Sequence, residues 1–239
     1  MEKNNKGKYL KYAIGEIILV VIGILIALQI NNWNEVNKNK HIETLFLQDF
    51  VTDLKSDIET LKVAIVGNNL KLNAADSIIA TLSNKNTLTS NELPTFISYN
   101  EELTGESYFI PEKSTIRQFE AGNNTQIIAS KNLKDKLFRY YAYNDKSEQN
   151  MEKSLQLYQH NFITKDVFQS IFGGNVLKHL IGSDLGRPDL NLNDLKQNTD
   201  YIFSVVAKKS GTAIQNRNYQ LIIDSAEELI ILLNGELDE

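Results

Sequence analysis

The chain has 239 residues, a formal net charge of −5 and no cysteine, and 42% of its residues are hydrophobic. The absence of cysteine excludes disulfide bonds, thiol catalysis and thiolate metal sites. The negative charge argues against a nucleic-acid partner, because phosphate binding requires a basic surface. The length allows a membrane anchor and one or two modest domains.

An apolar stretch close to the amino terminus predicts a membrane-spanning helix over residues 12–33. Residues 17–28 contain no polar side chain, and about 20 mainly apolar residues are needed to cross about 30 Å of hydrocarbon. Tyr12 and Trp33 are predicted interface anchors, because a rise of 1.5 Å per residue separates them by roughly 31 Å. A cleaved secretory signal would have a shorter apolar core and a small-residue cleavage site. We therefore predict a retained anchor in the lipid bilayer.

The lysines that flank this helix predict its orientation. Four precede it, Lys3, Lys6, Lys8 and Lys11, and two follow it, Lys38 and Lys40. The more basic flank favours the cytoplasm, so residues 1–11 are expected to form a short basic cytoplasmic tail. The first twelve residues carry a net charge of +3, which leaves −8 for the part of the chain expected outside.

One face of the predicted membrane helix is suited to packing against another helix. Residues recur on it at steps of three and four: Ala13, Glu16, Val20, Gly23 and Ala27. Gly23 and Ala27 form a small-xxx-small pair, which lets a second backbone approach closely. For Glu16 two interpretations stay open. Its carboxylate reaches the headgroups near Lys8 or Lys11, or it faces a partner helix as a polar contact or an ion-coupling group.

Beyond the membrane, residues 34–41 are expected to form a juxtamembrane hinge, because their asparagines are poor helix formers. The alternative stays open that the membrane helix continues outward with little break. Residues 42–239 then form the outer domain. Apolar residues recur at steps of three and four from Leu47 to Leu82, interrupted by Asn68. This pattern predicts a coiled-coil-like helix of about 40 residues.

Three aspartates, Asp49, Asp53 and Asp57, recur every four residues along this helix. A cation site would also need a turn or opposing ligands, and the sequence indicates neither. A solvated acidic face is the favoured interpretation.

Residues 85–113 are expected to link two longer helices and to contain one short helix after Pro94. Ser114 is expected to cap a second short helix, which Gly122 ends. Ser130 is expected to cap another long helix, whose apolar stripe continues to Phe162.

An aromatic cluster lies on that long helix. Tyr140, Tyr141 and Tyr143 are a candidate contact surface that could stack on a ligand or a partner peptide. Aromatic side chains at helical spacing more often belong to a core, which is the favoured interpretation.

The last third of the chain completes the predicted fold. Residues 171–188 contain four glycines but lack the Gly-Lys-Ser/Thr ending of a phosphate loop, and they are expected to form a loop or a broken helix. An apolar stripe then runs from Ile202 to Leu233, with Gly211 as a candidate break. The fold class is predicted to be all-α: a single N-terminal transmembrane helix followed by an extended antiparallel helical bundle with coiled-coil-like long helices.

The sequence contains no catalytic signature. The histidines are far apart and match no metal-ligand pattern; they are His41, His160 and His179. Neither a G-x-S-x-G elbow nor a kinase signature occurs. We therefore expect no enzymatic activity, no cofactor and no metal site.

Three blocks of the sequence resemble a known family. They are YAIGEIILVVIGILIALQINNWNE at 12–35, GNNTQIIASKNLKDKLFRYY at 122–141 and AEELIILLNGEL at 226–237. They resemble an uncharacterised membrane-anchored family of the Bacteroidota, domain of unknown function 6090. The resemblance implies a single-pass inner-membrane protein with an outer, periplasmic helical domain. It implies no established reaction, cofactor or catalytic residue.

These patterns favour a structural or interaction protein, a scaffold or assembly factor that associates with itself or with another membrane protein. Two alternatives stay open. One is a periplasmic sensing module, whose short cytoplasmic tail leaves the output to a partner. The other is an ion-coupled accessory subunit that uses Glu16, in an arrangement similar to that of proton-motive-force transducing subunits.

Overall fold

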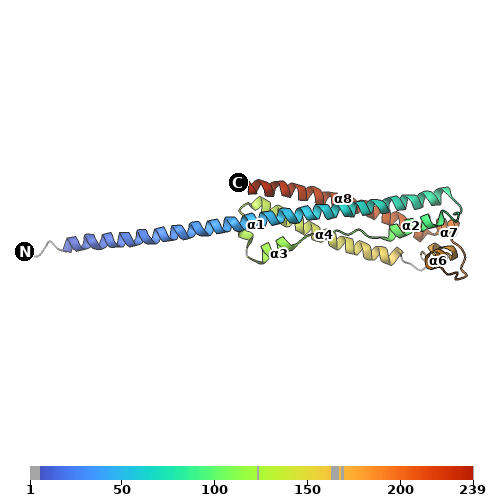
Figure 1. Cartoon of the computed structure of the whole chain (residues 1–239), viewed down its shortest axis with the longest axis horizontal. Helices are drawn as coiled ribbons and strands as arrows, with labels where there is room; N and C mark the ends of the chain where they lie inside the picture. The colour runs from blue at the N-terminus through green and yellow to red at the C-terminus, as the bar shows by residue number, and fades with distance from the viewer. Residues whose placement is uncertain (1–5, 123, 163–166, 168–169, 239) are drawn as a thin grey trace, which may run out of the picture.

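The computed structural model describes residues 6–122, 124–162, 167 and 170–238, and these residues form helices and connections without a strand among them. The long helices are α1 (Lys6–Asn84), α4 (Lys131–Phe162) and α8 (Thr199–Leu237). The shorter elements are α2 (Leu93–Thr104), α3 (Ser114–Ala121), the 3₁₀ turn η1 (Asn124–Gln126), α6 (Gly174–Ile181) and α7 (Leu192–Gln197). Figure 1 shows α1 projecting from a rod-shaped bundle. The predicted all-α fold class is confirmed.

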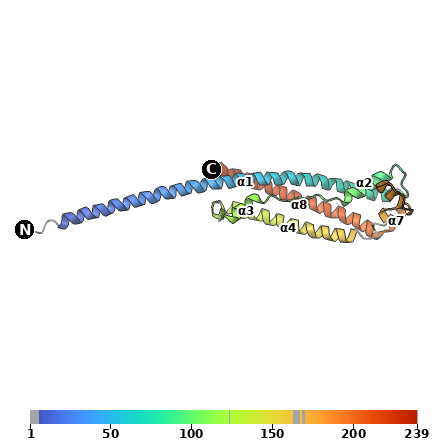
Figure 2. The ribbon, with the colours of Figure 1, turned by 60° about the horizontal axis from the view of Figure 1, so that its bottom comes forward.

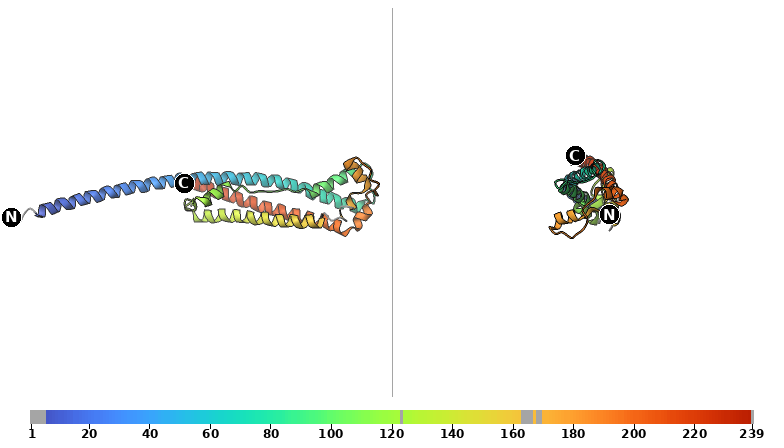
Figure 3. Two further views of the ribbon diagram at one scale, coloured as in Figure 1. Left: turned by 90° about the horizontal axis from the view of Figure 1, so that it is seen from below. Right: turned by 90° about the vertical axis from the view of Figure 1, so that its right-hand side faces the viewer.

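Helix α1 is a single helix of 79 residues, which corresponds to about 118 Å. Residues 34–41 are helical throughout, so the membrane-proximal helix continues outward without a break and the expected hinge does not interrupt it. Each asparagine costs up to about 0.7 kcal/mol relative to alanine in a helix, but ending the helix and restarting it would require a second costly nucleus. Because helix-forming segments flank the asparagines on both sides, the helix propagates through them. Figure 3 shows α1 as one gently curved rod.

The first part of α1 is, within the described chain, the one helix that is long and apolar enough to span a membrane. Side chains of residues 9–41 are all exposed, so no other described part of the chain covers this stretch. Its apolar surface is therefore available to lipid or to another helix.

The bundle is built around α1 and α8, which lie side by side and antiparallel. The end of α8 at Leu237 returns beside the middle of α1, whereas α4 packs on α8 and runs in the same direction as α1 (Figures 1 and 2). Asn68 Nδ2 of α1 donates to Gln215 Oε1 of α8 at 3.1 Å, and Asp76 of α1 forms an ion pair with Lys209. The short helices α2, α6 and α7 gather at the end farthest from the amino terminus (Figure 1).

Two apolar clusters fill the bundle. The cluster nearer the amino terminus joins α1, α3, α4 and α8, and its buried side chains include Phe50, Leu54, Leu61, Phe119 and Leu233. The far cluster joins α1, α2, α7 and α8, and includes Ile78, Leu103, Leu192, Leu195 and Tyr201. Burial of such a side chain contributes roughly 1.5–3 kcal/mol relative to exposure. The hydroxyl of the fully buried Tyr201 donates to Asn100 Oδ1 at 2.8 Å, so the far cluster contains a paired polar group.

Two serines predicted to cap helices have different roles in the structure. Ser130 Oγ accepts a hydrogen bond from the backbone N–H of Leu133 at 3.4 Å, which confirms its capping role at α4. Ser114 is instead the first residue of α3, and its own N–H donates to Glu112 Oε1 at 3.1 Å. The predicted cap at Ser114 is therefore wrong: Lys113 occupies the N-cap position without a side-chain capping bond, and the Glu112 carboxylate accepts from the first N–H of the helix.

Of the two glycines expected to end helices, Gly122 is the C-cap of α3, whereas Gly211 does not end a helix. Gly211 lies inside the unbroken helix α8. Lys208 and Thr212 beside it are buried, and this packing outweighs the roughly 1 kcal/mol that an interior glycine costs. Gly182 ends α6 with a φ of 71°, in the left-handed region that favours glycine. The predicted broken helix at 171–188 thus corresponds to α6 and the loop after it.

Candidate functional site

The predicted membrane face lies on the uncovered part of α1. Its five residues, Ala13, Glu16, Val20, Gly23 and Ala27, are exposed along one helix, and an added Cβ at Gly23 would meet nothing within 4 Å. The interface anchors Tyr12 and Trp33 are 78% and 67% exposed. The role of Tyr12 and Trp33 as interface anchors stays a prediction, as does the packing of the five-residue face against another helix.

Inside the bundle, polar side chains of α1 hold an extended segment that we call the connector (residues 105–113). Lys71 Nζ donates to Ser107 Oγ at 2.5 Å, near the start of the connector. Asp57 Oδ1 accepts from the backbone N–H of Glu112 at 2.7 Å, near its end. Asp53 Oδ2 accepts from the N–H of Thr115 in the first turn of α3 at 3.3 Å. Helix α1 therefore fixes the path of the chain between α2 and α3.

The aspartates do not form the solvated acidic face that the sequence favoured, and they do not form a cation site. Asp53 and Asp57 are 7% and 1% exposed, and their oxygens face backbone N–H groups and a tyrosine. Asp49, one turn earlier, is exposed. Both earlier interpretations are wrong for Asp53 and Asp57, because the connector and α3 cover this side of α1.

The burial of these carboxylates changes their acidity. Burial raises the pKa of Asp57 from its ordinary value of 3.8 to about 6, against the lowering effect of its hydrogen bonds to Glu112 and Tyr140. Burial also raises the pKa of Asp53, with smaller contributions from the nearby negative charges of Glu112 and Asp49. Among the described residues neither carboxylate has a salt-bridge partner. The pair is therefore a buried negative site held by hydrogen bonds.

The aromatic cluster on α4 belongs largely to the core and not to a contact surface. Tyr140 and Tyr141 are 3% and 5% exposed, whereas Tyr143 is 44% exposed. The hydroxyl of Tyr140 donates to Asp57 Oδ2 at 2.7 Å, and burial raises the pKa of both buried tyrosines. The three tyrosines therefore do not form one contact surface, because Tyr140 and Tyr141 are buried while Tyr143 lies about 200° around the helix from Tyr141.

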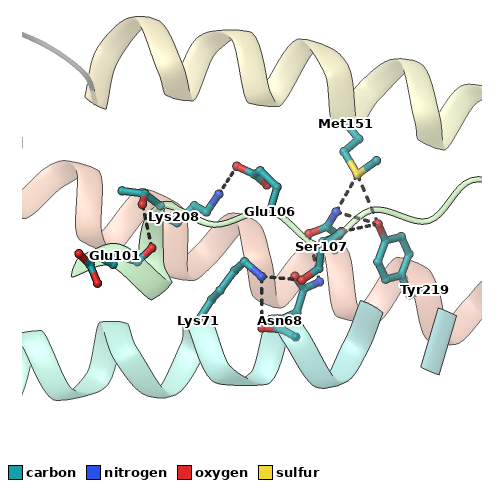
Figure 4. Close-up of polar contacts among 11 residues, drawn as sticks. Asn68, Lys71, Glu101, Glu106, Ser107, Met151, Lys208 and Tyr219 are labelled. Atoms are coloured by element: carbon teal, nitrogen blue, oxygen red, sulfur yellow. Dashed lines mark hydrogen bonds and ion pairs between the residues drawn. The ribbon is translucent and has the colours of Figure 1, made fainter. Parts of the chain in front are cut away.

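Polar side chains of α1, α8 and the connector meet in a layer between the levels of the two apolar clusters, and Figure 4 shows their contacts. Tyr219 of α8 donates through its hydroxyl to the carbonyl of Ser107 at 3.3 Å, and it accepts from Gln215 Nε2 at 2.9 Å. Lys208 of α8 forms an ion pair with Glu106. The lysine side chain is 9% exposed and the carboxylate 21%. The layer thus ties α1, α8 and the connector together at one level.

Lys71 is the most buried charge in this layer, with 4% exposure. Its ammonium donates to the Gly67 carbonyl at 3.2 Å as well as to Ser107. Burial lowers its pKa, while the charges of Glu102 and Glu106 act in the opposite direction. A buried ammonium is stable only when its protons are paired, so the contact with Ser107 is important for the layer.

Gly67 makes room for that contact, and its replacement by alanine is expected to destabilise the bundle by about 1 kcal/mol. An added Cβ would lie 2.5 Å from Ser107 Oγ. The serine would have to rotate and leave Lys71, which outweighs the roughly 1 kcal/mol that alanine gains in a helix. Thermal unfolding of Gly67→Ala, Ser107→Ala and the double variant tests this. The two losses should be less than additive, and fully additive losses would contradict the contact.

An open groove of about 690 Å³ lies where the bundle begins on α1. It is lined by Val36, Asn39, Lys40, Glu43, Thr44, Leu47, Gln126, Ile127, Ala129 and Glu236. Glu43 accepts from the N–H of Ala129 at 2.9 Å, which fixes the loop before α4 against α1. The groove mixes apolar and charged side chains without a group that identifies a ligand.

The described residues contain no cluster of three or more His, Asp or Glu side chains that could hold a metal ion. His41 lies on the exposed part of α1 and His179 on α6, while the side chain of His160 lies outside the described residues. The same holds for Tyr158 and for Phe162, the predicted end of the apolar stripe on α4.

The sequence reasoning missed the connector contacts of Lys71, Ser107, Glu106 and Lys208. One signal was present, because Asn68 interrupts the apolar stripe of α1 at a core position. A polar residue there predicts polar partners from elsewhere in the chain. Which partners meet it depends on segments that lie more than 30 residues away.

Comparison with known proteins gives one match. A model for a family of unknown function (DUF6090) matches residues 16–145, which include the apolar part of α1, the buried aspartates, the connector and the first half of α4. No curated protein and no solved structure matches the chain. Since the matched residues make up more than half of its length, the chain belongs to the family of unknown function DUF6090.

Proposed function

We propose that this chain is a single-pass protein of a bacterial inner membrane that carries a stiff helical bundle in the periplasm and acts there as an interaction or assembly protein. The single observation that carries the proposal is the unbroken helix α1, which contains both the membrane-length apolar segment and the central helix of the bundle. From Trp33 to Asn84 the helix extends about 77 Å. A bundle built on this helix is held at a fixed height and orientation above the lipid.

The flanking charges support the orientation. Four lysines precede the apolar segment and two follow it, which favours a cytoplasmic amino terminus. The proposed arrangement places the bundle, the connector and the groove on the periplasmic side.

The interior of the bundle supports a structural role. Its buried charged groups contact other parts of the same chain: Lys208 pairs with Glu106, and Asp57 binds the backbone of the connector. Buried networks of this kind rigidify a fold and specify one packing. Binding to partners would then use the outer surface of the bundle or the membrane helix.

Topology can be tested with single cysteines, because the natural chain has none. Lys6→Cys and Ser83→Cys lie on opposite sides of the apolar segment. In cells with a permeabilised outer membrane, a membrane-impermeant maleimide should label position 83 and leave position 6 unlabelled until the inner membrane is disrupted. Labelling of position 6 alone would show that the protein has the opposite orientation. Release of the protein by alkaline carbonate would contradict the anchor itself.

The interaction role can be tested by a mild-detergent pull-down of the tagged full-length protein from its native membrane. The wild type should retain a stoichiometric partner protein or a second copy of itself. The matched variant is Asn37→Pro, which interrupts α1 between membrane and bundle at a cost of about 3 kcal/mol in the helix. Recovery of the chain as a lone monomer in the wild type would contradict an interaction role.

A further inference from the structure

One face of α1 remains uncovered where the helix forms part of the bundle. Val63, Val66 and Leu70 recur on it at steps of three and four, and they are 72%, 63% and 53% exposed. The neighbours of α1 lie on its other sides, where Lys71 meets the connector and Asp76 meets α8. Adjacent apolar side chains in water favour a partner that removes them from solvent.

This apolar face is in register with the small-residue face of the membrane segment. Ala27 and Val63 are 36 residues apart, which is ten turns of 3.6 residues, and Glu16 and Leu70 are 54 residues apart, which is fifteen turns. Leu45, 46% exposed, lies midway between Ala27 and Val63. Because α1 is unbroken, these residues point in one direction along about 81 Å of helix.

The register restricts what can cover the face. A partner must run parallel to α1 through the membrane and continue outward beside the bundle. A second copy of this chain in the same membrane has this path, because it has the same helix in the same orientation. A parallel two-fold pair then places each residue of the face opposite its own equivalent. We infer that the chain forms a parallel homodimer along this face of α1. The inference rests on the proposed membrane anchor and names the partner that the proposed function leaves open.

The contact between the two copies differs along the face, because the side chains differ between the membrane and the bundle. In the membrane, Gly23 and Ala27 allow close approach of the two backbones. The two Glu16 side chains also meet on this face, where each offers the other a polar contact away from lipid. Between Leu45 and Val63 the face is polar, with Thr52, Ser56 and Glu59, and the Glu59 carboxylate pairs with Lys62 of its own helix at 3.2 Å. The contact is therefore concentrated in the membrane and at Val63 to Leu70.

Disulfide crosslinking in native membranes tests the inference, using pairs of neighbouring positions that differ by about 100° around the helix. Val63→Cys is matched by Lys62→Cys, and Ala27→Cys by Leu28→Cys. Mild oxidation should give several-fold more covalent dimer at 63 and 27 than at 62 and 28, because a disulfide requires Cβ atoms about 3.5–4.5 Å apart. Equal yields within each pair, or a higher yield at Ile214→Cys on the exposed side of α8, would overturn the inference.

The outcome also separates this inference from the proposed function. Carbonate extraction of the same membranes reports on the anchor independently of crosslinking. A protein that stays in the membrane but shows no preference for position 63 would contradict the dimer alone. Val63→Glu provides a second test, because the side chain is 72% exposed and the change should leave the thermal unfolding of the bundle intact. It should abolish the dimer crosslinked through position 70 by placing like charges opposite each other.

Discussion

Replacement of Asp57 by alanine is expected to lower the free energy of unfolding of the bundle by about 3 kcal/mol. The change leaves the backbone N–H of Glu112 and the hydroxyl of Tyr140 without their acceptor, and both bonds are 2.7 Å long in the native protein. Each buried donor that loses its partner costs about 1–3 kcal/mol, offset in part because a buried charge is also removed. Urea unfolding of the full-length protein in mild detergent, followed by circular dichroism, measures the loss.

Asp49→Ala is the matched control for this experiment. Asp49 lies on the same helix two turns away but is exposed, so its removal should change stability by no more than about 0.5 kcal/mol. Equal losses of stability in Asp57→Ala and Asp49→Ala would contradict the hydrogen bonds of Asp57 to Glu112 and Tyr140.

Asp57 also makes the free energy of unfolding of the bundle depend on pH, in a direction that follows from its raised pKa. Its pKa is about 6 in the folded protein against an ordinary value of 3.8, so between these values the folded state binds more protons than the unfolded state. The free energy of unfolding should therefore fall as pH rises from about 4 to about 6, by an amount of the order of 2 kcal/mol, with a smaller remaining fall up to about pH 7 as the last protons leave the folded state. Asp53, whose pKa is also raised by burial, acts in the same direction.

The variant Asp57→Asn isolates that effect. Its amide oxygen can accept from Glu112 and its amide N–H can donate to Tyr140, so the shape and both contacts are kept without a titrating group. The decline in stability between pH 4 and 6 should be smaller in Asp57→Asn than in the wild type. An identical pH profile in the two proteins would assign the dependence to other groups.

Replacement of Gly174 by alanine is expected to destabilise the far end of the bundle by about 3 kcal/mol. An added Cβ would lie 2.1 Å from the carbonyl oxygen of Arg187, and the N–H of Gly174 donates to the carbonyl of Pro188 at 2.6 Å. Because the atoms in the way belong to the backbone, the loop after α6 would have to move. Hydrogen exchange of residues 174–191 should show faster exchange in the variant.

Gly211→Ala is the control for this substitution. Gly211 is also helical, and an added Cβ there meets nothing within 4 Å. Alanine at this position should raise stability by up to about 1 kcal/mol. Loss of stability at both glycines would indicate a general intolerance of side chains and not the close approach at Gly174.

The sequence predicted those features that depend on short-range patterns. The apolar run between Tyr12 and Trp33, the capping serine at 130 and the long apolar stripes are local signals, and each corresponds to an observed element. The helix does not end at the hinge expected among the asparagines of residues 34–41, because helix propagation is cooperative and the flanking turns outweigh local propensity. Gly211 does not interrupt α8 for a related reason, since packing of its buried neighbours keeps the helix formed on both sides.

The buried polar contacts could not be predicted in the same way. Asp53 and Asp57 lie at the edge of the apolar stripe, one position before Leu54 and Ile58. Whether that edge is solvated depends on a connector more than 50 residues later, and the spacing of the aspartates contains no information about it. The same is true of Lys71, whose partner Ser107 is 36 residues away.

The stiffness of α1 across the membrane boundary is the central claim, and distance measurements between spin labels test it most directly. Two double-cysteine variants have equal separations of 27 residues: Gln29→Cys with Ser56→Cys spans residues 34–41, and Ser56→Cys with Ser83→Cys lies within the bundle. Labelled full-length protein, diluted with unlabelled chain in lipid nanodiscs, should give narrow distributions centred near 40 Å for both pairs. A broad or clearly shorter distribution for the first pair alone would show a flexible joint between membrane and bundle, and would contradict the claim.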